Sequence, residues 1–383
     1  MKILFVCQQY IHSARWINQL KDAGHDIYVF DCLDRPIHKD LLWTNYTTGW
    51  TQRKLPKFKG EHFLKKRIPK LYNILKSYLE VTASERLNQL IHEIQPDLVH
   101  SLEMQSQTYH VQKVREQIDF KWAYFSWGSD LYFYQHKEKH VIKMKEVFKN
   151  LDYFFADNTR DLKLAKSLGF QKEVVNIFPG GGGYCLEDYQ KYIQPVSERK
   201  LILIKGYHHW AGRALQVLNA LELIIDEIKE YEIYVYSAHD SVVKKIEKLL
   251  KNQQLNIKYS TRKKEISHKE LLQKFGAAQI SIGNSVSDGI PNTLLESIIL
   301  GAFPIQSNPG GATEDYIENN INGFLIEDPE NPKEIASKIM IALKNEVLLN
   351  SAFEINKNIA QKIAYFKVQK SVLEVYQNIE NTL

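Results

Sequence analysis

Two carboxylates close together in the chain are candidates for binding a sugar. Asp288 is followed by Gly289, Ile290 and Pro291, and seven residues separate it from Glu296. Proline suits the first position of a helix, because its φ angle is preset and its missing amide hydrogen would have no partner there. The sequence therefore predicts a helix that begins at Pro291, with Asp288 just before it and Glu296 inside it. Both carboxylates could accept hydrogen bonds from hydroxyl groups.

The start of this helix is also a candidate site for phosphate. First-turn amides have no partner within the helix, and the positive end of the helix dipole attracts anions. The amides at this position belong to Ile290, Asn292, Thr293 and Leu294. A short strand and a polar loop precede them, and ligands bind at such strand ends in α/β sheets. The pattern predicts a site for a sugar that carries a diphosphate. Taken singly, each acid is equally well explained as a helix cap or a solvated residue.

The acidic pair belongs to a longer pattern, which continues in the turn Gly301–Pro304 after the predicted helix. In this pattern the chain resembles the retaining glycosyltransferases of family four. Their signature is two acids seven residues apart, with Gly-x-Pro after the first acid and again after the helix. The first acid is usually glutamate and is Asp288 here. The resemblance implies the GT-B fold, in which two Rossmann-like doubly wound α/β domains face each other across a cleft. It also implies that Glu296 binds the ribose, and that Asp288 and Gly289 orient the sugar.

Two basic residues near the start of the second predicted domain are candidates for holding the diphosphate. The strand 201–204 is followed by Lys205 and Gly206, and Arg213 stands before the next predicted helix. In the resembling family this loop places an arginine and a lysine on the diphosphate. The resemblance therefore implies catalytic roles for Lys205 and Arg213 beside Asp288, and a donor contact for Gly206. Fixed cations stabilise the charge that a leaving nucleoside diphosphate gains as the glycosidic bond breaks.

We expect no metal ion and no organic cofactor. His208 and His209 are adjacent, but they have no carboxylates at ligand spacing. No G-x-G-x-x-G follows the first strand, Lys2–Cys7, which argues against a dinucleotide. The glycine-rich run Phe178–Tyr184 lacks the Lys-Ser/Thr ending of a P-loop. It is interpreted mainly as a hinge, with donor contact as the alternative.

Polar loop residues at strand ends of the N-terminal half are candidates for the acceptor side. The chain opens β-α-β, which is typical of a doubly wound domain. His12 lies in the loop after the first strand, and Gly128, Ser129 and Asp130 follow a later strand. We assign these four residues to the acceptor side of the cleft; an ordinary loop role is the alternative for His12. The resembling family often has a histidine where Trp127 stands, so no catalytic histidine is assigned.

The length of 383 residues is sufficient for two domains, each with its own core. We expect an acceptor-binding domain over residues 1–180, a linker over 181–200 and a nucleotide-sugar-binding domain over 201–360. A C-terminal helix over 361–383 is expected to cross back to the first domain. Asp157, which follows a strand of the first domain, is either part of a helix cap or part of the cleft lining.

The segment Arg53–Lys76 contains nine basic residues and one acidic residue. Its apolar residues recur at helical spacing from Ile68 onwards. An anionic membrane surface is the partner that this composition favours, since anionic lipids attract basic amphipathic segments. A solvated face over the core is an equally weighted alternative. Nucleic acid binding is not expected, because no recognised motif accompanies the basic residues.

The composition is that of a globular protein with a net charge of +5. The three cysteines, Cys7, Cys32 and Cys185, are far apart and predict neither disulfides nor a metal cluster. Met1 leads directly into a strand, so no signal peptide is expected. The uncharged run Ser297–Thr313 contains glycine and proline and does not read as a membrane span. We therefore expect a cytoplasmic protein, which could bind peripherally to the inner face of the membrane.

The sequence thus predicts a retaining hexosyltransferase. It would move a sugar from a nucleoside diphosphate sugar to a glycan or lipid-linked acceptor, in cell-surface polysaccharide assembly. Two alternatives stay open. One is a sugar-nucleotide epimerase on the same fold. The other is a non-catalytic sugar-nucleotide-binding subunit, which Trp127 and Asp288 allow because both depart from the usual family pattern.

Overall fold

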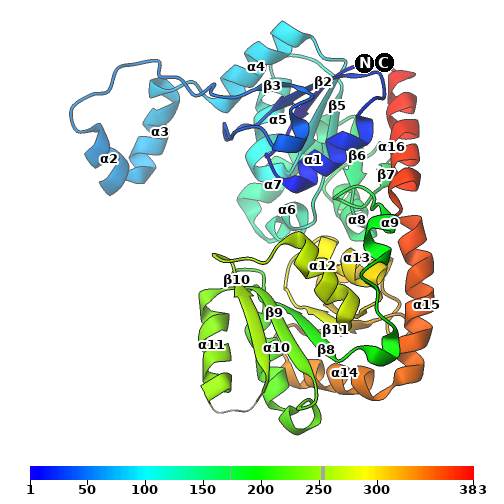
Figure 1. Cartoon of the computed structure of the whole chain (residues 1–383). Helices are drawn as coiled ribbons and strands as arrows, with labels where there is room; N and C mark the ends of the chain where they lie inside the picture. The colour runs from blue at the N-terminus through cyan, green and yellow to red at the C-terminus, as the bar shows by residue number, and fades with distance from the viewer. Residues whose placement is uncertain (173, 252–254) are drawn as a thin grey trace. The chain divides into compact units, whose positions relative to one another are not determined.

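The computed structural model describes residues 1–172, 174–251 and 255–383 and divides into two compact units (Figure 1). Unit 1 consists of Met1–Ala156, Leu162–Ile177 and Ser371–Leu383. Unit 2 consists of Asp157–Asp161 and Phe178–Lys370. The helices α8 (Thr159–Ser167) and α16 (Tyr365–Glu380) each contribute residues to both units.

Unit 1 is built on a seven-stranded parallel sheet of order β3-β2-β1-β4-β5-β6-β7. Its strands are β1 (Lys2–Val6), β2 (Asp26–Phe30), β3 (Asn45–Thr47), β4 (Leu98–Leu102), β5 (Trp122–Phe125), β6 (Tyr153–Ala156) and β7 (Val174–Ile177). Its helices are α1 (Ile11–Ile17), α2 (Glu61–Arg67), α3 (Pro69–Leu79), α4 (Ala83–Ile94), α5 (Tyr109–Arg115), α6 (Ser129–Tyr132) and α7 (Glu138–Asn150), with a π-helix at Met104–Thr108. The strand order reverses between β1 and β4, where sheets of this kind bind ligands.

The C-terminal segment Ser371–Leu383 packs within unit 1. The hydroxyl of Tyr376 lies 2.7 Å from Nδ1 of His100, which is fully buried in β4. The His100 ring contacts Phe5 and Phe155, with centroid separations of 5.3 and 4.7 Å. Burial lowers the pKa of His100 to about 3, so the imidazole is neutral at physiological pH.

Unit 2 is built on a six-stranded parallel sheet of order β10-β9-β8-β11-β12-β13. Its strands are β8 (Leu201–Lys205), β9 (Glu232–Ala238), β10 (Ile257–Thr261), β11 (Ala278–Gly283), β12 (Phe303–Ser307) and β13 (Phe324–Ile326). Its helices are α9 (Leu186–Gln190), α10 (Ala214–Glu222), α11 (Asp240–Lys251), α12 (His268–Ala277), α13 (Asn292–Leu300), α14 (Pro332–Lys344) and α15 (Glu346–Lys362). The strand order reverses between β8 and β11.

Helices cover both faces of the unit 2 sheet, because the strands are apolar on both sides. In β8, Ile202 and Ile204 pack with α10, α11 and α14. The alternate residues Leu201 and Leu203 pack with α12 and α13 on the other face. Both units are therefore doubly wound parallel sheets, and the predicted α/β architecture of two Rossmann-like domains is confirmed.

The segment 181–200, which we expected to be a linker, is part of unit 2. Tyr184 and Tyr189 are buried in its core, so this segment packs as part of the domain. Tyr184 also interrupts the C-terminal helix: its amide donates to the carbonyl of Ile363, and its carbonyl accepts from the amide of Tyr365. The C-terminal part of the chain consequently forms two helices, α15 and α16, which are separated between Lys362 and Tyr365. Within the described residues, no helix is both long and apolar enough to cross a membrane.

Candidate functional site

The switch point of unit 2 brings together two predicted site residues. Lys205 ends β8, and Asp288 follows β11, the strand that pairs with β8. The Lys205 Nζ lies 3.7 Å from Oδ2 of Asp288, and both side chains are partly exposed. An ammonium and a carboxylate thus stand together at the carboxyl edge of the sheet, where parallel α/β sheets bind ligands.

Arg213, the other predicted cation, is engaged by its own loop. It caps α10, and its guanidinium is paired with the carboxylate of Glu330. Its Nη1 also donates to the carbonyls of His209 and Gly212, each at 3.0 Å. These contacts give Arg213 a structural role in holding the loop between β8 and α10.

Arg262, which follows β10, is a further cation near Lys205, and the sequence did not assign it to the diphosphate. Both cations contact the ring of Tyr207. The ring centroid is 4.8 Å from Lys205 Nζ and 5.0 Å from the Arg262 guanidinium carbon. Arg262 also donates a 2.6 Å hydrogen bond to the Tyr207 hydroxyl. The pKa of His209 is lowered by burial, then by His239 and Lys205, and also by Arg262. Lys205 and Arg262, at the carboxyl ends of β8 and β10, therefore form a pair of cations that both contact Tyr207.

The helix α13 begins one residue later than predicted. Pro291 has φ −65° and ψ 132°, so it is the extended residue that caps the helix, and Asn292 is the first helical residue. The Leu294 amide donates to the Pro291 carbonyl at 2.9 Å, which removes it from the set of amides predicted to bind phosphate. The amides of Asn292 and Thr293 occupy the first two helical positions, where a helix supplies no acceptor.

The amide of Ile290 is also occupied, which corrects its predicted role. It donates to Oδ2 of Asp157 at 3.1 Å. Asp157 is buried and accepts a further hydrogen bond from the side chain of Asn158. Burial is the main cause that raises the pKa of Asp157 well above its usual range, with the nearby charge of Asp161 as the next cause. Gly289 lies directly against this carboxyl group, and a Cβ there would overlap Oδ2 of Asp157.

A buried ion pair holds the backbone on either side of the motif. Arg160 donates through Nε and Nη2 to Oδ1 of Asp161 at 2.9 and 2.8 Å. Its Nη1 donates to the carbonyls of Asp288 and Pro309 at 2.9 and 2.6 Å. Both side chains are buried. Arg160 therefore fixes the loop after β11 to the loop after β12.

Glu296 is buried on α13, with 3% of its surface exposed. Its Oε1 is 2.7 Å from Nε2 of His268. His268 is the first residue of α12, where Ser267 and Glu270 form a capping box that fixes the start of the helix. The structure thus gives Glu296 an imidazole partner that the sequence did not predict.

Two glycines near these residues allow close backbone approach. A Cβ on Gly206 would lie 2.6 Å from the Cα of Ala238, so a side chain there would push apart the ends of β8 and β9. Gly206 also donates its amide to the Tyr236 carbonyl at 2.8 Å. In the glycine-rich run, a Cβ on Gly181 would lie 3.0 Å from Oδ1 of Asn292. This run therefore packs at the start of α13 in unit 2.

The predicted acceptor-side residues lie in unit 1. His12 lies in the first turn of α1 and not in the loop after β1, because α1 begins at Ile11. Its ring is 5.9 Å from that of Trp127, so the start of α1 meets the loop after β5. Gly128 has φ 73°, a left-handed conformation that favours glycine, and Ser129 begins the short helix α6.

Asp130 is buried, and its carboxylate is fully used within the unit. It accepts from the amides of Met104 and Trp127 at 3.0 and 2.9 Å, and from the Tyr124 hydroxyl at 2.6 Å. Asp130 therefore shapes the loop that carries Trp127. This assignment differs from the predicted contact with the acceptor.

Glu103 is a residue at the switch point of unit 1 that we did not predict. It has φ 76°, which is uncommon for a residue other than glycine, and it begins the π-helix Met104–Thr108. Its carboxylate accepts from the amides of Gln105 and Ser106 and, at 3.3 Å, from the side chain of Gln8. Strained residues and π-helices are enriched at functional sites. Neither feature has a signal in the sequence.

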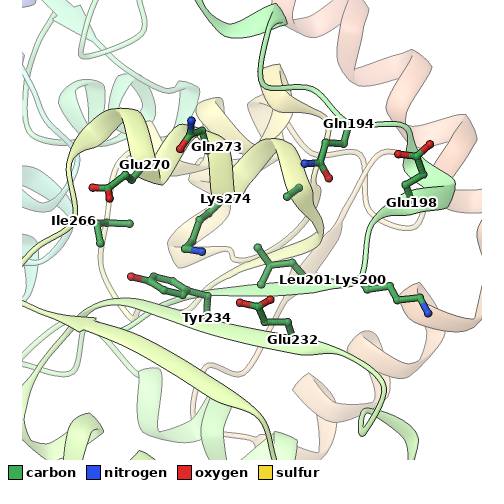
Figure 2. A pocket seen from close by; sticks show the side chains of 11 residues that line it. Gln194, Glu198, Lys200, Leu201, Glu232, Tyr234, Ile266, Glu270, Gln273 and Lys274 are labelled. Atoms are coloured by element: carbon green, nitrogen blue, oxygen red, sulfur yellow. The ribbon is translucent and has the colours of Figure 1, made fainter.

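A cavity of about 490 Å³ lies elsewhere in unit 2 (Figure 2). It is lined by residues at the amino ends of β8 and β9, including Leu201 and Glu232, and by Lys274 of α12. The Lys274 ammonium lies 4.2 Å from the ring centroid of Tyr234. The cavity is therefore at the edge of the sheet opposite to Lys205. In the part of the chain that the structure describes, no group of three His, Cys, Asp or Glu residues could hold a metal ion.

Comparison with known families agrees with this architecture. Residues 2–158 match the family described as Glycosyl transferase 4-like, and residues 263–362 match the family described as Glycosyl transferases group 1. Both matches are to glycosyltransferase families, and the two doubly wound units have the GT-B architecture.

Solved structures show the same fold over the whole length. HepE of Anabaena, solved in complex with UDP-glucose, is 13% identical with a TM-score of 0.70, over 99% of this chain and 100% of that chain. Sucrose-phosphate synthase of Thermosynechococcus elongatus is 14% identical with a TM-score of 0.72, over 100% of both chains.

Two curated relatives match over shorter segments. The GtfA subunit of the UDP-N-acetylglucosamine–peptide N-acetylglucosaminyltransferase of Streptococcus agalactiae is 31% identical over 108 residues, which are 27% of this chain and 21% of that protein. The poly(ribitol-phosphate) α-N-acetylglucosaminyltransferase of Staphylococcus aureus (strain COL) is 25% identical over 170 residues, which are 43% of this chain and 32% of that protein. The matches thus span about a fifth and a third of these relatives.

Proposed function

We propose that this chain transfers a hexosyl group from a nucleoside diphosphate sugar to a glycan or lipid-linked acceptor, with retention of configuration, in cell-surface polysaccharide assembly. The observation that carries the proposal is the pair formed by Lys205 and Asp288, 3.7 Å apart at the switch point of unit 2. The start of α13 follows Asp288 by four residues and supplies first-turn amides. One position thus combines a cation, a helix N-terminus and a carboxylate.

In this proposal the diphosphate is held by Lys205, Arg262 and the amides of Asn292 and Thr293. When the bond from the sugar C1 to the diphosphate oxygen breaks, that oxygen keeps the electron pair. The acceptor hydroxyl forms the new bond to C1, and its proton passes to the released diphosphate oxygen. Fixed cations stabilise the leaving group most as its charge develops. No metal ion is required, since the cations and the helix N-terminus supply positive charge.

The remaining donor contacts follow from the neighbouring carboxylates. Glu296 accepts hydrogen bonds from the ribose hydroxyls, and its bond to His268 orients the carboxylate for that purpose. Asp288 and Gly289 orient the transferred sugar. Arg213 supports the loop that carries Tyr207, so its contribution to the donor site is indirect. The proposal thus uses Lys205 and Arg262 in place of the predicted pair Lys205 and Arg213, although Arg262 also lies 3.4 Å from the carboxylate of Glu265.

UDP-linked sugars are the first donors to test. The Streptococcus relative is named for UDP-N-acetylglucosamine, and the HepE structure contains UDP-glucose. On the acceptor side, the meeting of His12 and Trp127 at the carboxyl edge of unit 1 supports an acceptor subsite there. An aromatic face suits the apolar side of a sugar ring, and a histidine can take a proton from a hydroxyl.

The proposal is tested by measuring UDP release and product formation with UDP-glucose and UDP-N-acetylglucosamine over an acceptor panel. Lys205→Ala is expected to lower kcat by roughly 10²-fold or more, the loss typical of removing one group that stabilises a developing charge. Arg262→Ala is expected to lower kcat and donor affinity together. Glu296→Gln is expected mainly to raise KM for the donor. Lys258→Ala is the matched control, because Lys258 is an exposed cation on β10, the strand that Arg262 follows, and pairs with Glu232.

The alternatives give different results in the same assays. Conversion of the donor to another sugar nucleotide without any acceptor would identify an epimerase. Donor binding by calorimetry without transfer or hydrolysis would identify a binding subunit. Full transfer activity in both Lys205→Ala and Glu296→Gln would refute the proposed site.

A further inference from the structure

The basic segment predicted at Arg53–Lys76 forms a helical hairpin of unit 1, here called the basic hairpin and defined as residues 53–80. It consists of α2 and α3, which lie side by side (Figure 1). Its two ends meet in an antiparallel bridge between Arg53 and Glu80. The Lys54 amide donates to the Leu79 carbonyl at 2.8 Å and strengthens this closure.

The acidic residue inside the predicted segment, Glu61, is already neutralised. Arg53 donates to both of its carboxylate oxygens, at 2.7 and 2.9 Å, and this hydrogen bonding is the main cause that lowers the pKa of Glu61. The Tyr72 hydroxyl donates to the same carboxylate at 3.3 Å. Lys54 is paired in turn with Glu85 at 2.6 Å. These contacts use Arg53 and Lys54 to hold the hairpin together.

Six further basic side chains of the hairpin are exposed. They are Lys57, Lys59, Lys65, Lys66, Arg67 and Lys70. Within residues 1–172, 174–251 and 255–383, no carboxylate lies within ion-pair distance of any of these six side chains. Their charges are therefore not balanced within the protein. Exposed cations without partners attract an anionic surface over distances of about a Debye length.

The hairpin also exposes large apolar side chains. Leu71, Ile74 and Tyr78 follow one face of α3 at helical spacing, and Ile74 and Tyr78 are 66% and 70% exposed. Phe63 of α2 is 62% exposed. The opposite side of α3 carries Tyr72, which is buried. One apolar face of α3 thus packs within unit 1, and a second apolar face does not.

We propose that the basic hairpin docks the protein on an anionic membrane surface. The six lysine and arginine side chains bind lipid phosphates, and Phe63, Ile74 and Tyr78 enter the boundary between headgroups and acyl chains. Aromatic and basic residues on one amphipathic element are typical of interfacial helices. A second copy of the chain fits less well, because a two-fold contact would place the six cations against an equal set. A nucleic acid would leave the exposed aliphatic face without a partner.

Vesicle flotation tests this proposal without any sugar nucleotide, so its result does not depend on the proposed transfer activity. The full chain is mixed with vesicles of phosphatidylcholine and phosphatidylglycerol, or of phosphatidylcholine alone. We expect binding to the mixed vesicles, weakened by salt. The triple variant Lys65→Gln, Lys66→Gln, Arg67→Gln is expected to lose about fivefold in partition coefficient for each residue, or about a hundredfold in all.

A matched triple variant on α7 serves as the control. Lys139→Gln, Lys145→Gln and Lys149→Gln remove three exposed lysines from the same unit and should leave binding nearly unchanged. For the apolar face, Ile74→Ser is expected to weaken binding to the mixed vesicles more than Ile142→Ser, since Ile142 is 55% exposed on α7. Circular dichroism and thermal unfolding establish that each variant is folded.

Three results would overturn the proposal. The first is an absence of binding to the mixed vesicles by the folded wild-type chain. The second is equal loss in the hairpin triple variant and the α7 triple variant. The third is a dimer in sedimentation experiments that Ile74→Ser dissociates, because the apolar face would then belong to a contact between copies.

Discussion

Replacement of Arg160 by methionine should destabilise unit 2 and loosen the Asp288 loop at the same time. Arg160 is paired with the buried carboxylate of Asp161 and donates to the carbonyls of Asp288 and Pro309. Breaking a buried ion pair by removing one partner costs about 3–5 kcal/mol, because the other charge remains buried without compensation. We therefore expect Arg160→Met to lose ~4 kcal/mol of stability.

A double variant separates the charge from the positioning contacts. The double variant Arg160→Met, Asp161→Asn no longer has the unpaired buried charge. It still lacks the two hydrogen bonds from Arg160 to the carbonyls of Asp288 and Pro309. Leaving a buried acceptor without its donor costs about 1–3 kcal/mol. We expect the double variant to recover ~2 kcal/mol of the single variant's loss. Donor affinity should stay low in both, because the Asp288 carbonyl has lost its donor in both.

Hydrogen exchange of peptides that span residues 281–295 reports the stability of this part of unit 2, and calorimetry with UDP reports donor affinity. The informative comparison is between the single and double variants at the same pH. A loss below about 1 kcal/mol in Arg160→Met would refute the buried-pair argument. Wild-type UDP affinity in the folded double variant would refute the positioning role of Arg160.

Two further variants test other parts of the structure. Gly289→Ala should lower both donor affinity and stability, the latter by about 1–3 kcal/mol, because the new Cβ would overlap Oδ2 of Asp157. Unchanged UDP affinity by calorimetry would contradict this prediction. Burial lowers the pKa of His100 to about 3 in the folded chain. Below pH 6.5 this imidazole therefore binds a proton in the unfolded chain but not in the folded one. Stability in denaturant titrations should therefore fall by about 1.4 kcal/mol per pH unit between pH 6.5 and 3 on this account. His100→Gln should flatten that slope, and His62→Gln, at an exposed position, should leave it as in the wild type.

The sheets, and the loops that lie at their carboxyl edges, were predictable because they depend on local patterns. Runs of apolar residues predicted the strands, and the order strand, loop, helix predicted which loops lie at the carboxyl edge of each sheet. The predicted start of α13 was one residue too early. Proline has the same φ as a cap and as a first helical residue, and only its ψ angle distinguishes the two positions. The start of α12 is also fixed locally, by the capping box of Ser267 and Glu270.

The cation pair was less predictable, because it depends on distant partners. Arg213 has the residue type that the family pattern requires, but its partner Glu330 lies 117 residues further along the chain. Arg262 is close to Lys205 only because β10 and β8 both flank β9. Residue type and spacing identify which loops reach the edge of a sheet. Which of these loops lie next to Lys205 depends on the order of the strands in the sheet, which no local pattern contains.

The residues of the acidic motif are explained by what surrounds them in unit 2. Gly289 lacks a side chain because the carboxyl group of Asp157 occupies that space. Ile290 buries its side chain and gives its amide to the same carboxyl group. Pro291 has no amide hydrogen to place and ends the extended stretch with a fixed φ. The three residues after Asp288 therefore have little freedom to move.

Asp288 is the member of the motif whose side chain remains at the edge of the sheet. Its carbonyl is held by Arg160, and its carboxylate lies 3.7 Å from the Lys205 ammonium. A carboxylate fixed through its own backbone keeps its position when a ligand binds, and little conformational entropy is then lost. The shorter aspartate is consistent with such a role, because the rigid loop already sets how far the carboxylate reaches. On this argument, Asp157 and Arg160 act as positioning residues of the proposed donor site, although neither is expected to contact the sugar nucleotide.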